Sequence, residues 1–256
     1  MSESIRAVER ALDVLLCFSK QTPELTMTQI AEQVGMHKST VHRFLATLER
    51  QRFVQRDPAT GMYRPGLRVL QLAYLTLENN DIRRLAAPFL RRLWEQHRET
   101  VTLSVLDDTD VIYLDVIESP QRVKLAAAVG QRLPAFSTAS GKAILMSLPE
   151  TVVRQILASG MELYTHATLR SPEDVLENLR NARQQGFALS LEEYEEGISA
   201  VAVPILDPAG QPLAAMAVAG PAFRLPRERM NQIGPQILAV AGEFSKEFEM
   251  AAHSGK

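Results

Sequence analysis

The sequence predicts an α+β protein with two domains joined by a helix. Its 256 residues suffice for two domains of ordinary size. Helical periodicity fills the first third, and the remainder mixes strands with helices without regular βα alternation, which is typical of an antiparallel sheet. Apolar residues make up 46% of the chain, enough for a sizeable core. We expect one domain over 1–65, a linking helix in 66–80 and a second domain over 81–256.

Two helices open the first domain. Thr26 and Gln29 fit the S/T-x-x-E/Q capping box, so a short helix should begin there and end near Gly35. Ahead of it, residues 4–19 have an apolar stripe at helical spacing, which predicts a helix with one buried face. That stripe consists of Ile5, Val8, Ala11, Leu12, Leu15 and Leu16.

The segment "VGMHKSTVHRFLATLERQRFV", residues 34–54, predicts a third helix with an exposed polar face. Val41, Phe44, Leu45 and Leu48 recur at i, i+3, i+4 and i+7 and should be buried. Two short helices joined by a glycine turn are typical of a helix-turn-helix, whose second helix enters the major groove with its N-terminal end. Small hydroxyls, histidine and basic residues off this stripe suit base edges and phosphates, namely Lys38, Ser39, Thr40, His42 and Arg43.

After this helix, "FVQRDPATGMYR" predicts two short strands around a Pro-Ala-Thr-Gly turn, the hairpin of a winged helix-turn-helix. It would direct Arg56 and Arg64 toward the DNA backbone or the minor groove. Residues 1–65 hold nine Lys/Arg and seven Asp/Glu, a net charge of +2, whereas the remainder has a net charge of −4. Duplex DNA is the predicted partner, and a small helical subdomain with a solvated basic face is the alternative.

The helix predicted over 67–77 has two apolar faces, whereas a helix on the surface of a monomer buries only one face. Pairing with the same helix of a second copy would bury them, which predicts a dimer; an internal core helix is the alternative. One face holds Leu67, Leu70, Tyr74 and Leu77, and the other holds Val69, Leu72 and Leu75.

The second domain should open with an amphipathic helix over 81–98. The segments "VTLSVLD" and "DVIYLDVIE" predict a hairpin, and "RVKLAAAVG" a third strand. Ser171 and Gly186 bound another helix. "FALS", "AVAVPILD" and "PLAAMAVAG" predict further strands, and a final helix should fill 226–250.

Three segments, "SIRAVERALDVLLCF", "IAEQVGMHKSTVHRFLATLERQRFV" and "YRPGLRVLQLA", resemble the DNA-binding domain of the IclR family of bacterial regulators. The resemblance implies a winged helix-turn-helix, a linker helix and a GAF-like effector domain. It also implies a repressor of a catabolic operon that acts as a dimer or tetramer. Activation or dual regulation is the alternative. The family often has Ser where this chain has His37, which is a weaker N-cap.

"GQRLPAFSTASGKAIL" predicts where a small molecule binds. A loop leads directly into a helix, which leaves the backbone amides of Ala139, Ser140 and Gly141 to attract a carboxylate or phosphate. A helix capped by its own Ser137 or Thr138 is the alternative. The resemblance adds pocket positions from other segments, namely Leu125, Leu133, Ala135, Ser190, Ala200, Ala217 and Ala219.

Of the last four of these positions only Ser190 is polar, so we expect a roomy, apolar pocket. This favours an aromatic or branched carboxylate as effector, with a sugar acid second.

Enzyme motifs are absent. Ser140-Gly141-Lys142 resembles the end of a P-loop, but Phe136 occupies the position of its first glycine. G-x-S-x-G is missing, the histidines lack metal-ligand spacing, and Cys17 is the single cysteine. The glutamates of "LEEYEEG" are more typical of a solvated turn than of a metal or acid–base site. We therefore expect neither an enzyme nor a cofactor; a small-molecule-binding module without a transcriptional role is the alternative from another class.

No apolar run reaches the ~18 residues that a membrane span needs, and no secretory signal is visible at the N-terminus. We expect a cytoplasmic protein. Its predicted partners are near-palindromic operator DNA, a small carboxylate and further copies of itself.

Overall fold

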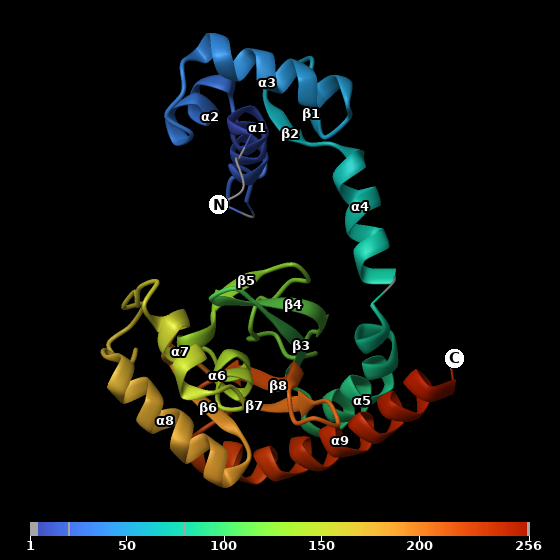
Figure 1. Ribbon diagram of the computed structural model, residues 1–256, viewed down its shortest axis with the longest axis vertical. Helices are drawn as coiled ribbons and strands as arrows, with labels where there is room; N and C mark the ends of the chain where they lie inside the picture. Colours follow the sequence, from blue (N-terminus) through green and yellow to red (C-terminus); the bar gives the residue numbers. More distant parts are fainter. Residues whose placement is uncertain (1–4, 20, 79, 255–256) are drawn as a thin grey trace. The chain divides into compact units, whose positions relative to one another are not determined.

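The computed structural model describes residues 5–19, 21–78 and 80–254; Ser4, in the predicted first helix, lies outside these ranges. The chain forms two compact units, residues 1–79 and 80–256 (Figure 1). The first is a winged helix-turn-helix followed by a helix, and the second is an antiparallel sheet covered by helices on both faces. The predicted α+β class is confirmed.

The helix-turn-helix and its wing share a small apolar core. The capping box of Thr26 and Gln29 is present, with both reciprocal hydrogen bonds formed. The wing pairs its strands antiparallel with Gln55 opposite Arg64. The core joins Val14, Leu25, Ile30, Val41, Leu45, Leu48, Val54 and Tyr63. The elements are α1 (Arg6–Leu16), α2 (Met27–Gln33), α3 (Lys38–Arg50), β1 (Val54–Arg56) and β2 (Tyr63–Pro65).

The prediction that the apolar stripe of α1 is buried is wrong for four of its six residues; Ala11 and Leu15 are half-buried, and Leu15 packs against the core. Ile5, Val8, Leu12 and Leu16 have exposed fractions of 69%, 54%, 52% and 79%. Val14, which lies across the helix from this stripe at 100° per residue, enters the core instead. These four residues of the stripe therefore form an uncovered apolar surface of the first unit.

A second uncovered apolar surface belongs to α4 (Leu67–Glu78), which has no buried residue. Leu67, Leu70 and Tyr74 on one face are 76%, 66% and 58% exposed. The helix leaves the wing through a close contact at Gly66, where a Cβ atom would lie 2.2 Å from the carbonyl oxygen of Arg52. A glycine is therefore needed at this position.

The second unit is built on one six-stranded sheet, in the order β5-β4-β3-β8-β7-β6, with all neighbours antiparallel. Helices α5 (Asp81–His97) and α9 (Arg227–Ser254) cover one face, and α6 (Ala139–Leu145), α7 (Glu150–Leu157) and α8 (Pro172–Gln185) the other (Figure 1). The strands are β3 (Thr100–Asp107), β4 (Asp110–Ile117), β5 (Arg132–Pro134), β6 (Ala188–Leu191), β7 (Ile198–Leu206) and β8 (Pro212–Pro221).

Large and small side chains alternate across the central strands. Val201, Val203, Met216 and Val218 face the core with α5 and α9, whereas the residues between them face α6 and its neighbours. Those are alanines: Ala200, Ala202, Ala215, Ala217 and Ala219. Because side chains alternate between faces, the small ones leave space on the α6 side of the sheet.

Residues 122–130 do not form the predicted third strand. The edge of β4 pairs instead with β5, with Val111 opposite Leu133. Beyond this pairing, the Tyr113 carbonyl accepts a hydrogen bond from the Gly130 amide, and the Tyr113 amide donates one to the Gln131 carbonyl. The backbone groups of β4 at this edge therefore already have partners. The sequence reading also missed α7. The predicted helix bounded by Ser171 and Gly186 is confirmed; in the structure Ser171 also forms a capping box with Asp174, and Gly186 is left-handed.

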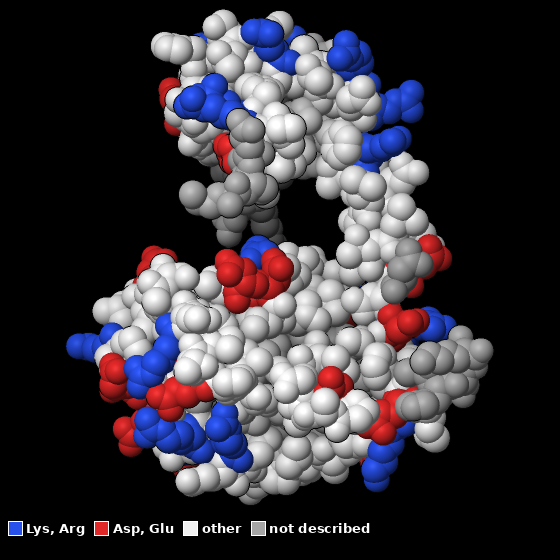
Figure 2. Space-filling model, viewed as in Figure 1, with Lys and Arg blue, Asp and Glu red and all other residues white. Residues whose placement is uncertain are grey.

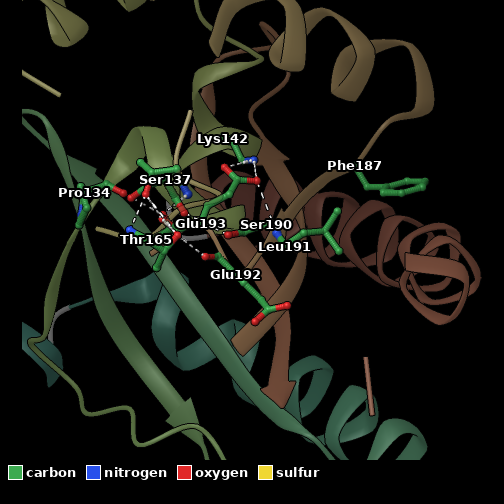
Figure 3. A network of polar contacts seen from close by, with 12 residues as sticks. Pro134, Ser137, Lys142, Thr165, Phe187, Ser190, Leu191, Glu192 and Glu193 are labelled. Carbon is green, nitrogen blue, oxygen red and sulfur yellow. Dashed lines mark hydrogen bonds and ion pairs between the residues drawn. The ribbon is translucent and has the colours of Figure 1, made fainter. Parts of the chain in front are cut away.

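A buried ion pair joins α6 to the loop between β6 and β7. Lys142 has no exposed surface, and its Nζ donates to both carboxylate oxygens of Glu193, at 2.6 and 2.7 Å (Figure 3). Burial lowers the pKa of Lys142 and raises that of Glu193, and the attraction of each for the other opposes these shifts. The prediction that these glutamates form a solvated turn is wrong for Glu193.

Side chains from another loop hold the same segment. The Thr165 hydroxyl donates to the carbonyl of Glu192 at 2.6 Å, and the Thr168 hydroxyl to that of Glu193 at 2.7 Å. The Glu192 carboxylate accepts the Gly197 amide at 2.7 Å. Residues 192–197 are thus fixed relative to α6, as Figure 3 shows for the labelled members of this network.

Replacing Lys142 with Met should destabilise the second unit by about 3–5 kcal/mol, because a buried carboxylate loses its partner. Chemical denaturation followed by circular dichroism measures the change. Lys124→Met is the matched control: Lys124 bonds Glu118 at the surface, and exposed pairs contribute only about 0–1 kcal/mol. Adding Glu193→Leu to Lys142→Met should restore part of the lost stability. Equal destabilisation by Lys142→Met and Lys124→Met would contradict the role of the buried pair.

Candidate functional site

The predicted DNA-contacting residues of α3 lie together at its start. Val41, Leu45 and Leu48 are buried, and helical geometry puts Ser39 and Arg43 on the opposite side. Lys38 and His42 are exposed beside them, and Thr40 is half-buried. The first two turns of α3 therefore present a polar, basic surface.

The N-terminus of α3 lacks a side-chain cap. His37 is its N-cap residue, as predicted, and its side chain makes no capping hydrogen bond. The His37 carbonyl accepts the amides of Thr40 and Val41, but no side chain caps the first turn. An uncapped helix start attracts anions such as phosphate, because its amides and the helix dipole are positive there.

The two wing arginines are exposed, but each has a local partner. Arg56 lies over the ring of Tyr63, 5.6 Å from its centroid, and donates to the Gly61 carbonyl at 3.4 Å. Arg64 lies 3.6 Å from Glu24. Exposed contacts of this kind are weak, so a phosphate can displace them at small cost.

Sequence reasoning missed Arg6 and Arg10. These side chains of α1 line a surface hollow together with Thr40 and Arg43 of α3. The i, i+4 spacing of Arg6 and Arg10 puts both on one side of α1, but the sequence does not show that this side lies against α3. On the face shown in Figure 2, the charged side chains over the first unit are mostly basic.

A cavity lies in the second unit, between the alanine-rich face of the sheet and the start of α6. Its 570 Å³ of space between atoms includes open solvent at its mouth. Eight of the ten predicted effector-binding residues line it: Leu125, Leu133, Ala139, Ser140, Ser190, Ala200, Ala217 and Ala219.

The other two predicted residues, Ala135 and Gly141, pack against each other instead of facing this cavity. A Cβ atom on Gly141 would lie 2.1 Å from the Ala135 carbonyl oxygen, so only glycine fits there. The Gly141 amide donates to Thr138 Oγ1 at 3.2 Å. The expectation of three free amides is therefore wrong at Gly141, where the self-capped alternative holds.

The lining is more polar than the sequence predicted. The alanines form the floor, but hydroxyl, amide and carboxylate side chains from several segments surround it. Tyr113 could be found from the alternation of β4, whereas nothing local in the sequence places the loop residues Tyr194 and Glu195 at this cavity. The missed polar residues are Thr102, Tyr113, Gln131, Thr138, Tyr194, Glu195 and Ser199.

Hydrogen bonds fix two walls of the cavity. Ser190 Oγ donates to the Ser137 carbonyl at 3.0 Å and ties β6 to the turn before α6. Arg224 donates to the Val123 carbonyl at 2.9 Å and to both oxygens of the buried Glu99 at 2.7 Å. This holds the loop before β5, which carries Leu125, in place.

Within the described residues, no group of three or more His, Cys, Asp or Glu side chains has the arrangement of a metal site. None of the described helices combines the length and the hydropathy that a bilayer span requires.

Comparisons with known proteins agree with this architecture. Residues 7–58 match the family described as IclR helix-turn-helix domain, and residues 74–246 match Bacterial transcriptional regulator IclR C-terminal. The acetate operon repressor of Salmonella typhimurium is 31% identical over 94% of this chain and 89% of its own length.

Solved structures share the fold. An IclR transcriptional regulator from Alicyclobacillus acidocaldarius is 29% identical, with a TM-score of 0.83 over 95% of this chain and 99% of that one. An IclR homolog from Microbacterium hydrocarbonoxydans, complexed with 4-hydroxybenzoate, is 24% identical, with a TM-score of 0.80 over 94% and 99% of the two chains. At that identity the second likeness concerns the fold alone. The chain belongs to the IclR family of bacterial transcriptional regulators, and it is a regulator, not an enzyme.

Proposed function

We propose that the protein is a cytoplasmic repressor of a catabolic operon, and that binding of a small carboxylate changes its affinity for operator DNA. Its domains are then a DNA-binding domain over 1–65, a linker over 66–80 and an effector domain over 81–256. The observation that carries this proposal is the start of α3, where Ser39 and Arg43 face away from a fully apolar core stripe.

Each part of the first unit has a role on DNA in this proposal. The side chains at the start of α3 read base edges in the major groove, and the uncapped helix start binds a phosphate. Arg56 and Arg64 contact the backbone once they leave their local partners. Arg6 and Arg10 of α1, which share a hollow with Arg43, add positive charge beside the same surface.

Replacing Arg43 with Ala should weaken operator binding by about 1–3 kcal/mol and relax the preference at one base pair, if its guanidinium contacts a base. Fluorescence anisotropy with the operator and single-base variants measures both effects. Arg180→Ala is the matched control, because Arg180 is exposed on α8 in the other unit. Operator binding unchanged in the Arg43 variant would rule out this assignment.

The uncovered apolar surfaces support a dimer. Leu67, Leu70 and Tyr74 of α4 and the stripe of α1 belong to the same unit and are largely exposed. Burying apolar surface contributes roughly 25 cal/mol per Å², so pairing of these helices with a second copy is favourable. A dimer presents two α3 helices, which implies a near-palindromic operator with half-sites about one helical turn apart. A tetramer is the alternative assembly.

Introducing Glu at Leu70 should break the dimer and reduce operator binding together, because a charge would enter the apolar contact. Gln71→Glu, which adds the same charge at an exposed polar position of the same helix, should do neither. Sedimentation velocity and anisotropy on the same samples give both readouts. A monomeric wild-type protein would refute the dimer.

The cavity of the second unit is the proposed effector site. The amides of Ala139 and Ser140 and the dipole of α6 attract the carboxylate, while Leu125, Leu133 and the alanines enclose an aromatic or branched body. A ligand changes operator affinity only if it binds one conformation better than another. Coupling of about 1–3 kcal/mol, transmitted through the linker, would change that affinity roughly 5- to 150-fold.

Filling the cavity by Ala217→Leu should abolish the response to carboxylates and leave ligand-free operator binding near normal. A thermal-shift screen of carboxylates on the wild type first identifies a binder, and operator titrations with that binder then compare the variants. Ala209→Leu, the same change in the exposed turn before β8, is the control. Ser140→Pro removes one amide donor and should act like Ala217→Leu. Wild-type responses in both cavity variants would place the effector elsewhere.

A further inference from the structure

We infer that the effector carries a hydrogen-bond donor, an amine or a hydroxyl, in addition to its carboxylate, and that Glu195 with Tyr113 and Tyr194 recognises this donor. The inference rests on the proposed effector role of the cavity. It names a ligand class and three specificity-determining residues that the family resemblance did not indicate.

The charge of the lining is the first observation. Among the described residues that line the cavity, Glu195 is the one charged side chain, and none is Lys or Arg. A carboxylate ligand therefore finds only neutral donors at the start of α6, while a negative charge lies elsewhere on the lining. A second carboxylate on the ligand would be repelled by Glu195, whereas an ammonium or hydroxyl group would satisfy it.

Two phenol groups accompany Glu195. Burial, with Tyr194 and Glu195 nearby, raises the pKa of Tyr113, and burial also raises that of Tyr194. Both hydroxyls therefore stay protonated, so each can donate to Glu195 or accept from a ligand. Tyr113 comes from β4, whereas Tyr194 and Glu195 come from the loop between β6 and β7, so two separate elements supply the three groups.

The loop that carries Glu195 is fixed before any ligand arrives. Glu193, two residues earlier, is held by the buried Lys142, and Thr168 holds the Glu193 carbonyl. Tyr194 packs on Tyr164 with ring centroids 4.9 Å apart. Lys142 belongs to α6, whose first residues line the same cavity. The contact of Lys142 with Glu193 (Figure 3) thus joins the start of α6 to the loop that carries Glu195, which reduces the ordering cost of binding.

Two matched ligand series test the inference on the full-length protein. The aromatic series is benzoate, 4-hydroxybenzoate, 4-(aminomethyl)benzoate and terephthalate; the aliphatic series is pentanoate, 5-hydroxypentanoate, 5-aminopentanoate and glutarate. Calorimetric titration should show, in at least one series, that a donor-bearing member binds about tenfold tighter than the unsubstituted acid and that the dicarboxylate binds weakest. The hydroxyl and amine members distinguish the two donors.

Glu195→Gln should reduce the affinity for the ammonium member about tenfold, leave that for the unsubstituted acid within about twofold, and improve that for the dicarboxylate. Glu196→Gln is the control, because it removes the same charge one residue away and does not line the cavity. Tyr113→Phe should weaken the preferred donor-bearing member and spare the unsubstituted acid.

The outcomes separate this inference from the proposed function. If the unsubstituted acid or the dicarboxylate binds as tightly as the donor-bearing member, the donor inference is wrong and the carboxylate response stands. Equal effects of Glu195→Gln and Glu196→Gln would also overturn it. If no member of either series binds and the wider carboxylate screen is also negative, the proposed effector response fails, and the inference with it.

Discussion

The ion pair between Lys142 and Glu193 holds two sides of the proposed effector cavity together. Lys142 lies two residues after Ser140 on α6, and Glu193 precedes Tyr194, so each partner is adjacent in sequence to residues that line the cavity. Removing both charges from water costs several kcal/mol per ion, and only close, well-directed contacts offset that cost. The bidentate contact at 2.6 and 2.7 Å provides them. A pair of this kind contributes little net stability, but it selects one position of the loop over others.

The cavity itself follows from the side chains of the central strands. Close packing fills protein interiors, so empty space needs a reason. Here Val201, Val203, Met216 and Val218 of β7 and β8 face α5 and α9, whereas alanines of the same strands face α6. Gly141 lets α6 approach the turn at Ala135, which brings the helix start close to the sheet without filling the space above Ala217. Rigid contacts thus surround a cavity that lies above the alanines of the sheet.

Features encoded locally could be predicted from the sequence. The capping box at Thr26, the N-cap at Ser171 and the glycine end of α8 depend on residues within one turn, and each formed as expected. The exposure of most of the α1 stripe could not be predicted, because periodicity identifies an apolar face but not what covers it. Residues 122–130 had strand-like composition, yet the hydrogen bonds of Tyr113 were already used by the turn at Gly130 and Gln131.

The candidate sites likewise combine residues whose positions follow from the local sequence with residues whose positions depend on the tertiary fold. Five of the seven predicted DNA-contacting residues belong to α3, and its apolar stripe alone determines which of them face outward. Most of the predicted cavity residues came from the family resemblance, whereas the polar part of the lining depends on how a loop folds back onto α6. A run of glutamates gives no sign that Glu193 is buried against Lys142 while Glu195 lines a cavity.

This difference has a consequence for function within the family. A shared fold fixes the class of protein, here a transcriptional regulator, but the ligand is chosen by the few side chains that line the cavity. In this chain the alanines of the cavity carry neither a charge nor a side-chain hydrogen-bonding group, so discrimination between ligands has to come from the polar side chains of the lining. A buried or half-buried acceptor discriminates strongly, because a ligand without a donor leaves it unpaired. The phenols of the buried Tyr113 and the half-buried Tyr194 meet that condition on this lining, and the exposed Glu195 beside them adds a negative charge.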